Sequence, residues 1–462
     1  MSIVKILETL DRAHTGPVHS VKEWDTRIIP GQSAKRVREH GLQNTFSLEN
    51  PINSDDALAD EFYRAGFEMA VETGLLCVDT ERVINVTREE LQDALDSMPS
   101  EVVVGKGADE VVVRARRPED PVKPVLEAPL AIVISEDIWI SLMTQIAELP
   151  EVDLNHGGSL ATVFGRQVLS GTPFETLLGR VEAQMNREVL WRAGRSGMCT
   201  VAVSSSTTEY GVLGGFGVPG GYDADFDVVV VLSPSELKTS YSSLHKVVHA
   251  INCGAKFISG SHSYIGGYAG TPEATAVCAI AAALLQRAVH WCRLASQVTI
   301  DDIRYVGSCS RAAQWALGIA LQAVSRNTHL PRTAIVTETA GPCTRMLLYE
   351  AAMGMMNISV SGTSMSTACR SSGGKYTDYL TPLEIKFCGE VYKACAGMTR
   401  KQANEIARVI IPKYEEFLLN PPKGLSVYEC YDLENRRPKK EWFDIYMDVK
   451  KEMVDLGIPL NL

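Results

Sequence analysis

The sequence predicts an α/β protein built on a (β/α)8 barrel of the TIM type, with helical extensions at both ends. Two observations favour this fold. Short apolar or β-branched runs alternate with longer helical stretches, and about eight such repeats follow one another. The chain has 462 residues, of which 45% are hydrophobic and 22% charged, so it can bury a large core. One barrel with extensions accounts for this length.

Helix starts are marked by a hydroxyl side chain followed three residues later by Glu. In such a capping box each side chain satisfies a free backbone amide at the start of the helix. The Glu residues of these boxes, including Glu236, are therefore assigned a structural role rather than a catalytic one. Helical stretches are expected at 236–251, 272–296 and 310–325. Capping boxes are expected at Thr87, Thr172, Ser233 and Thr381, and a similar helix start at Thr271.

The strand candidates are short runs of apolar and β-branched residues. Two valine-rich runs at 102–104 and 111–113 precede them and predict a hairpin ahead of the barrel. We expect a largely helical N-terminal extension with this hairpin over residues 1–125, the barrel over 126–400, and C-terminal helices packed on it over 401–462. The barrel strands are expected at 130–135, 160–164, 198–203, 228–232, 256–259, 303–306, 333–337 and 358–360.

Composition excludes several classes of protein. A formal net charge of -11 argues against a nucleic-acid partner, whose phosphates require a basic surface. The longest apolar run, Val277 to Leu285, is far shorter than the roughly 18 residues of a membrane span. The N-terminal residues lack a signal-peptide pattern, so a cytoplasmic protein is expected. The 11 cysteines include no Cys-x-x-Cys pair and are expected to be buried free thiols.

Three long loops follow predicted strands and are expected to frame the active site. In such barrels the chemistry lies at the carboxyl ends of the strands, and long loops in compact domains are usually functional. These loops cover 204–226, 260–270 and 361–380. Their glycine clusters match no nucleotide-binding fingerprint in spacing or context, so no dinucleotide site is expected.

Six separated stretches of the chain resemble one enzyme family, the monomethylamine:corrinoid methyltransferases. The resemblance covers nearly the whole chain. It implies a methyltransferase that moves a methyl group from a methylated amine to Co(I) of a cognate corrinoid protein. That separate protein supplies the cobalamin and docks over the barrel mouth, so no tightly bound cofactor is expected. A homo-oligomer is also implied. The stretches are Ala-Gly-Phe-Glu-Met at 65–69, Cys-Val-Asp-Thr at 77–80, Ile-Ser-Glu-Asp at 134–137, Gly-Gly-Tyr-Ala-Gly at 266–270, Ala-Gly-Pro-Cys-Thr at 340–344 and Glu-Cys-Tyr-Asp at 429–432.

Residues 198–206 resemble the strand that carries pyrrolysine, the methylamine acceptor of this family. Val201 occupies that place here, and no Lys lies between Lys123 and Lys238. The family also places two glutamates, a glutamine and a tyrosine around the acceptor ring. This set is absent as a whole, which implies a different methyl donor. The corresponding residues of this chain are Val230, Gly260, Ile335 and Thr337.

The chemistry of demethylation supports an activated donor. A neutral primary amine is a very poor leaving group, and pyrrolysine activates it by covalent addition. A quaternary ammonium needs no such help. Pyrrolysine-free relatives of the trimethylamine methyltransferases act on quaternary amines such as betaines, and by analogy this chain is expected to use a quaternary or otherwise activated N-methyl donor.

Such a site would hold a cation with aromatic faces and a carboxylate. Glu338 directly follows a predicted strand and is the first candidate for charge pairing, although a structural role fits equally well. His262 is a candidate for orienting or protonating a leaving group, or a hydrogen-bonded loop histidine. The aromatic candidates are Tyr210, Tyr222, Tyr264 and Trp315, the last of which also fits a core residue.

Other polar residues are also candidates for the site. Arg370 or Lys375 would pair with the carboxylate of a betaine. Asn155 and His156 lie at a strand or hairpin end, or serve a turn.

Two alternative functions remain open. Cys309, Cys343, His262 and Glu338 all lie near predicted strand ends and are of the types that bind zinc, which would assist transfer from an oxygen or sulfur donor. However, Cys343 belongs to the stretch that resembles the non-zinc amine family, so no metal is expected. The second alternative is a non-catalytic homologue that still binds a corrinoid protein.

Overall fold

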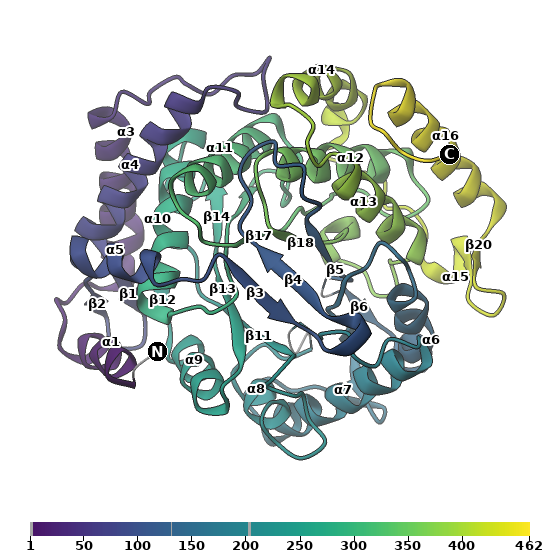
Figure 1. The fold of residues 1–462 in the computed structure, drawn as a ribbon, viewed down its shortest axis with the longest axis horizontal. Helices are drawn as coiled ribbons and strands as arrows, with labels where there is room; N and C mark the ends of the chain where they lie inside the picture. The colour runs from purple at the N-terminus through teal and green to yellow at the C-terminus, as the bar shows by residue number, and fades with distance from the viewer. Residues whose placement is uncertain (1–2, 131, 202–204) are drawn as a thin grey trace.

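A ring of parallel strands forms the centre of the molecule (Figure 1). The computed structural model describes residues 3–130, 132–201 and 205–462. Seven strands pair in one sheet, each parallel to its neighbour, and nearly all their side chains are buried, as in sheets covered by helices. In spatial order they are β11 (Val228–Leu232), β13 (Lys256–Gly260), β15 (Ala295–Gln297), β17 (Arg332–Ala334), β18 (Met365–Thr367), β5 (Val125–Ala128) and β7 (Leu154–Asn155).

One further segment joins the two edge strands of this sheet, β7 and β11. Thr200 forms a parallel bridge with Asn155 of β7, and Val201 forms one with Val228 of β11. The amide of Val201 donates to the Asn155 carbonyl (2.7 Å), and the amide of Val228 donates to the Thr200 carbonyl (2.9 Å). The segment takes the eighth place in the ring, which therefore closes as an α/β barrel.

Helices cover the outside of the ring (Figure 1). The expected capping boxes at Thr87 and Thr381 are present, and Thr271 caps its helix by accepting from the amide of Ala274 (3.3 Å). The box expected at Thr172 is wrong, because the Thr172 side chain makes no capping hydrogen bond there, although a helix does begin at the next residue. The helix that begins at Pro272 is long and apolar enough to cross a membrane by composition, but 94% of that window is buried inside the protein. The outer helices are α6 (Glu136–Ala147), α7 (Pro173–Arg192), α9 (Tyr241–Cys253), α10 (Pro272–His290), α11 (Arg311–Asn327), α12 (Arg345–Val360) and α13 (Pro382–Ala394).

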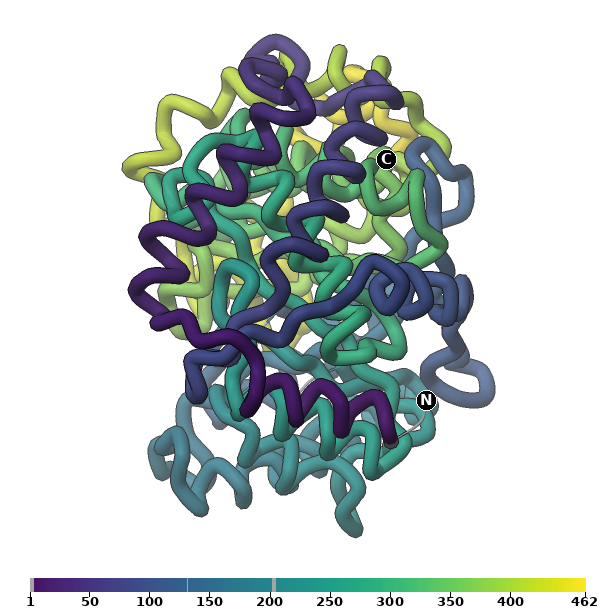
Figure 2. Tube along the Cα trace, turned by 90° about the vertical axis from the view of Figure 1, so that its left-hand side faces the viewer, coloured from purple at the N-terminus to yellow at the C-terminus, as the bar shows by residue number. Residues whose placement is uncertain are grey.

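The N-terminal helices lie together on one side of the barrel, as Figure 2 shows. The longest of them packs against α10 and α11. The contact is close at Gly66, where a Cβ atom would lie 2.4 Å from Cγ2 of Ile280, so only glycine allows this approach. The elements of this region are α1 (Ile3–Thr15), α2 (Val21–Glu23), the π-helical turn η1 (Trp24–Ile28), α3 (Ile29–Glu39), α4 (Asp56–Thr73), β1 (Leu75–Cys77), β2 (Arg82–Ile84) and α5 (Arg88–Asp96).

The predicted hairpin is confirmed as β3 (Glu101–Val104) and β4 (Val111–Arg114), and it lies across one end of the ring (Figure 1). At its turn, the amide of Gly105 donates to the Phe226 carbonyl (3.1 Å) and that of Lys106 to the Gly197 carbonyl (2.9 Å). Both carbonyls immediately precede barrel segments. The hairpin therefore covers the amino-terminal end of the barrel, opposite the end where the active site is expected.

Two short parallel strand pairs follow the barrel strands at the carboxyl end. β6 pairs with β8, and β14 pairs with β16. Further small elements surround them or precede the C-terminal region. These elements are η2 (Gly107–Asp109), β6 (Val133–Ile134), β8 (Ser159–Leu160), β9 (Thr162–Val163), β10 (Arg166–Gln167), α8 (Tyr210–Gly215), β12 (Lys238–Thr239), β14 (His262–Ile265), β16 (Thr299–Asp302) and η3 (Ser371–Gly374).

The C-terminal residues form helices that pack on α12 and α13. The indole of Trp442 donates to the hydroxyl of Thr381 (3.0 Å) and so joins the last helix to the start of α13. The elements are α14 (Arg400–Ile410), the turns η4 (Ile411–Lys413) and η5 (Glu415–Phe417), α15 (Val427–Cys430), β19 (Tyr431–Asp432), β20 (Arg437–Pro438) and α16 (Lys440–Asp455).

Two predicted strands are wrong. Residues 303–306 form a turn after β16, and residues 358–360 are the last turn of α12. Both runs are short and apolar, and such runs do not distinguish a strand from part of a buried helix or turn. The structure forms its strands at β15 and β18 instead.

Other strand predictions differ in position. The barrel strand expected at 130–135 is β5, which lies earlier, and only the short β6 falls within that range; residue 131 lies outside the described residues. The run at 160–164 is divided between β8 and β9. Residues 202 and 203 of the strand expected at 198–203 also lie outside the described residues.

The capping box expected at Ser233 is also wrong. The next helix, α9, begins at Tyr241 and is capped by Ser240. The Glu236 carboxylate instead accepts from the amides of Tyr264 (3.0 Å) and Ala269 (3.1 Å), so it holds the loop after β13. Its role is structural, as expected, but through a loop distant in sequence rather than through its own helix.

Candidate active site at the barrel mouth

A cavity of about 320 Å³ lies at the carboxyl ends of the barrel strands. Val230, Ile258 and Ile335 form apolar walls, from β11, from β13 and from the residue after β17 respectively. Thr333 and Thr367 line it from β17 and β18. The inward side chains of several strands therefore meet in one pocket, in the position where barrel enzymes bind their substrates.

A larger hollow of about 870 Å³ lies at the opposite end of the barrel. Lys5, Val102 of the hairpin and Trp291 line it. We place the active site in the smaller cavity, because the chemistry of such barrels occurs at the carboxyl ends of the strands.

Glu127 and His156 form a buried pair at this cavity. Glu127 lies on β5 and His156 directly follows β7, the neighbouring strand. Nδ1 of His156 is 3.4 Å from Oε1 of Glu127, and both residues are buried. Oε2 of Glu127 has no hydrogen-bond partner among the described residues. A buried carboxylate oxygen without a partner is costly, so a positively charged ligand in the cavity would stabilise it.

Lys246 brings an ammonium group to the same cavity. It lies on α9 and is only 8% exposed. Burial lowers the pKa of this ammonium below its usual value, while the charges of Glu209 and Glu175 act in the opposite direction. No hydrogen bond or ion pair joins Lys246 to another side chain in the described part of the chain. The cavity is thus lined by both an acidic and a basic residue, Glu127 and Lys246.

Gln297 fills the space beside Gly260. A Cβ atom at Gly260 would lie 2.4 Å from Cβ of Gln297, so no larger side chain fits there unless Gln297 moves. The Gln297 amide donates to the hydroxyl of Thr299 (3.0 Å), which fixes its orientation, and Gln297 lines the cavity.

His262 and Tyr264 lie together on β14, which follows β13 at the mouth. Nδ1 of His262 is 2.8 Å from Oδ2 of Asp301, and the rings of His262 and Tyr264 stack with their centroids 6.2 Å apart. Burial acts to raise the pKa of Asp301, but hydrogen bonds, chiefly with His262, hold it below its usual value. The charge of Arg370 acts on both Asp301 and Tyr264. This group forms a polar rim, but none of its members is among the described residues that line the cavity.

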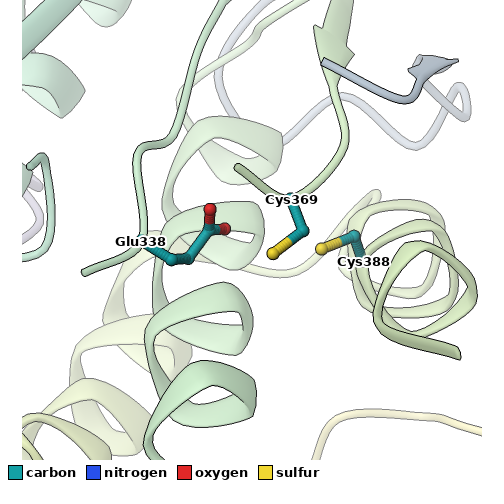
Figure 3. A group of neighbouring side chains, drawn as sticks. All are labelled: Glu338, Cys369 and Cys388. Carbon is teal, nitrogen blue, oxygen red and sulfur yellow. The ribbon is translucent and has the colours of Figure 1, made fainter. Parts of the chain in front are cut away.

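The carboxylate of Glu338 lies beside two cysteines. Figure 3 shows its carboxylate directed at the thiol of Cys369, with Cys388 beyond it. Burial raises the pKa of Glu338 to about 8. Glu338 is not among the described residues that line the cavity, where Glu127 provides the carboxylate. The zinc ligands considered from sequence do not assemble in the described residues; of that set, only Glu338 belongs to a close group of potential ligands.

Comparisons of the sequence and of the structure with known proteins point to the same family, and each match covers nearly the whole chain. The family model for monomethylamine methyltransferase MtmB matches residues 4–458. The chain belongs to this family. It is 29% identical over 452 residues to the monomethylamine methyltransferase MtmB of Methanosarcina mazei and to MtmB1 of Methanosarcina acetivorans, in each case over 97% of both chains. The crystal structure of the Methanosarcina barkeri enzyme matches with a TM-score of 0.94 and 28% identity over 98% of both chains.

The MtmB family comprises methyltransferases, and this chain is therefore a methyltransferase with an α/β barrel. The family expected from the sequence is confirmed, and of the expected fold the α/β barrel-like architecture is confirmed.

The residues expected to replace the acceptor set of the MtmB family are only partly gathered at the cavity. Val230 and Ile335 line it. Val201 is fully buried in the segment that closes the ring. Thr337 is buried behind the rim, where its amide donates to the hydroxyl of Ser308 (2.8 Å).

The aromatic candidates do not form a cage around the cavity in the described part of the chain. Tyr222 donates to Glu182 (3.1 Å), accepts from Asn186 (3.0 Å) and stacks on Phe216, so its ring is held in the core. Tyr210 is 40% exposed at the start of α8. Trp315 packs edge-on against Phe46 and Phe62, as a core residue does.

Sequence reasoning overlooked most of the polar residues of the cavity. It did not single out Glu127, Lys246 or Gln297, and it assigned His156 to a strand end or a turn. One signal was available for Glu127: it is an isolated acidic residue within an apolar run of residues 125–132. An isolated charge in such a run points to a buried, inward-facing site.

Proposed function

We propose that this methyltransferase takes a methyl group from a quaternary or otherwise activated N-methyl donor, rather than from monomethylamine. The acceptor in this proposal is the cobalt of a corrinoid on a separate cognate protein. Membership of the monomethylamine methyltransferase family supports the reaction class. The donor is argued from the residues of this chain.

The observation that carries the proposal is the unpartnered oxygen of Glu127 in a largely apolar cavity. A permanently cationic nitrogen beside this carboxylate would satisfy it, and the methyl groups would pack on Val230, Ile258 and Ile335. Apolar walls with a few fixed polar groups are typical of small-molecule sites. His156 would hold the carboxylate in place from its other oxygen.

Val201 supports the same donor. By the resemblance it stands where the family carries its amine acceptor, and a valine side chain offers no group that adds an amine. A quaternary nitrogen leaves as a neutral tertiary amine, so no proton or covalent activation is required for its departure. The residues of this chain would then bind and orient the donor and exclude water.

Lys246 narrows the donor class further. An ammonium in the same cavity as Glu127 suits a donor that carries a carboxylate as well as the quaternary nitrogen. This assigns to Lys246 the carboxylate-binding role considered for Arg370 and Lys375.

The corrinoid supplies a strongly nucleophilic Co(I) that accepts the methyl group. The open mouth, with its rim of His262 and Tyr264, is where we place the partner protein. The proposal also includes a homo-oligomer, which the resemblance implies, and a cytoplasmic location.

The test is methyl transfer to a Co(I) corrinoid protein, followed by absorbance, with monomethylamine and a panel of quaternary amines offered in parallel. Transfer from a quaternary amine alone supports the proposal. Transfer from monomethylamine would overturn the argument from Val201. Tight binding of the corrinoid protein without transfer from any donor would identify a non-catalytic homologue.

A further inference from the structure

A second cluster of reactive side chains lies beside the mouth, outside the cavity. It consists of Glu338, Cys369 and Cys388, whose potential ligand atoms all lie within 4.8 Å of one another. Each comes from a different segment: Glu338 follows β17, Cys369 follows β18 and Cys388 lies on α13. Figure 3 shows the carboxylate, the Cys369 sulfur and the Cys388 sulfur next to one another between these segments.

This cluster is completely buried and incompletely satisfied. All three residues are 0% exposed. Oε2 of Glu338 accepts from the amide of Arg370 (2.7 Å), whereas Oε1 has no partner in good hydrogen-bond geometry in the described structure; the nearby Cys369 thiol only partly offsets the rise in the pKa of Glu338 that burial causes. A buried polar oxygen without a partner is rare in proteins and points to a missing ligand.

The surroundings favour a positive charge at this point. The charge of Glu350 acts on Glu338, and that of Glu384 acts on both thiols, in each case against a further negative charge. Burial raises the pKa of Glu338, Glu350 and Glu384, and a bound cation would favour their charged forms and then be attracted by them.

We infer that Glu338, Cys369 and Cys388 bind one Zn²⁺ ion. Two sulfur ligands and one carboxylate suit Zn²⁺, which takes such ligands at about 2.0 to 2.3 Å in a tetrahedral arrangement. Magnesium and calcium prefer oxygen ligands and are disfavoured here. Coordination requires thiolates, so each thiol gives its proton to the solvent as the ion binds. A water molecule would fill the fourth position.

The ion would stabilise the loops at the mouth of the barrel. Ile335 and Thr367 line the cavity, and Glu338 and Cys369 follow them closely in the chain. An ion between these loops and α13 would tie two walls of the cavity to the outer helix layer. It would not touch the donor, since its ligands do not line the cavity in the described structure. This inference is therefore independent of the proposed function.

The experiment uses the full chain, reduced and freed of metal with a chelator. Zn²⁺ alone is titrated in, and bound metal is counted by elemental analysis after removal of the excess. Co²⁺ serves as a spectroscopic probe, because thiolate–cobalt bonds give charge-transfer absorption. We expect about one Zn²⁺ per chain, a higher Tm with Zn²⁺ and thiolate bands with Co²⁺.

The variants Glu338→Gln and Cys369→Ser/Cys388→Ser should bind Zn²⁺ at least about tenfold more weakly. Cys395→Ser is the matched control, since Cys395 is equally buried at the end of the same helix and outside the cluster. Wild-type protein without thiolate–cobalt bands would overturn the inference even if a variant does not fold. A Cys369–Cys388 disulfide found by mass spectrometry in protein that binds no metal would do the same.

Discussion

Replacement of Glu127 by Gln tests the electrostatic basis of donor binding. The substitution keeps the shape of the side chain but removes its charge. Two unit charges about 4 Å apart interact by roughly 4 kcal/mol at an effective dielectric constant of 20. The cation must also leave water, which offsets part of this energy, so we expect a net loss of about 2 kcal/mol, as for other interactions with charged groups. This corresponds to a roughly 30-fold lower kcat/KM for a quaternary donor.

The assay is the initial rate of cobalt methylation at several donor concentrations. Glu136→Gln is the matched control. Glu136 lies at the start of α6, and its carboxylate accepts from the amide of Phe164 (2.6 Å) rather than lining the described cavity. That variant should keep the wild-type kcat/KM. If Glu127→Gln folds with wild-type stability and leaves kcat/KM unchanged, a binding role for the carboxylate is refuted.

Three further outcomes are expected. Lys246→Met should raise KM roughly tenfold for donors that carry a carboxylate. For choline-like donors without a carboxylate, KM should stay unchanged. Steady-state kinetics measures both values, and an equal effect on both classes of donor would contradict carboxylate binding by Lys246. Gly179→Ala should destabilise the fold by about 2 kcal/mol or more in urea unfolding, because its Cβ would lie 1.9 Å from the carbonyl oxygen of Gly211; unchanged stability would disprove this tight packing. Burial lowers the pKa of His290 to about 4 from an ordinary value of 6.5, so the folded state opposes its protonation. Its contribution to stability is present above pH 6.5 and falls by about 3 kcal/mol as the pH drops to 4, and the same pH dependence in His290→Asn would contradict this origin.

The barrel was predictable from sequence because its central strands are buried on both faces. β11 and β13 appear as runs of apolar or small residues, and the structure forms them almost where expected. The hydrophobic pattern gave a wrong strand prediction where a short apolar run belonged to a helix or a turn. Residues 358–360 satisfy the pattern of a buried strand, yet they complete a buried helix, α12, which packs against α11, α13 and α16.

The carboxylate of the candidate site, Glu127, was missed for a related reason. The first barrel strand was expected at 130–135, so Glu127 fell outside it and seemed to precede the barrel. The structure places β5 earlier and turns Glu127 into the ring. Lys246 lies within a helix, where a lysine usually belongs to the solvated face; only the docking of α9 on the barrel brings it to the cavity. Such positions depend on tertiary packing and leave no local signal.

The hairpin formed by β3 and β4 has a consequence for the order of events in a catalytic cycle. Because it covers the amino-terminal end of the ring, the donor and the demethylated amine of the proposed reaction would both pass through the mouth. A corrinoid protein seated there would block that passage. The donor must then enter before the partner arrives, and the amine must wait until the partner departs. Turnover would therefore slow when the corrinoid protein is in large excess, because a new corrinoid protein would bind at the mouth before the demethylated amine had left the cavity.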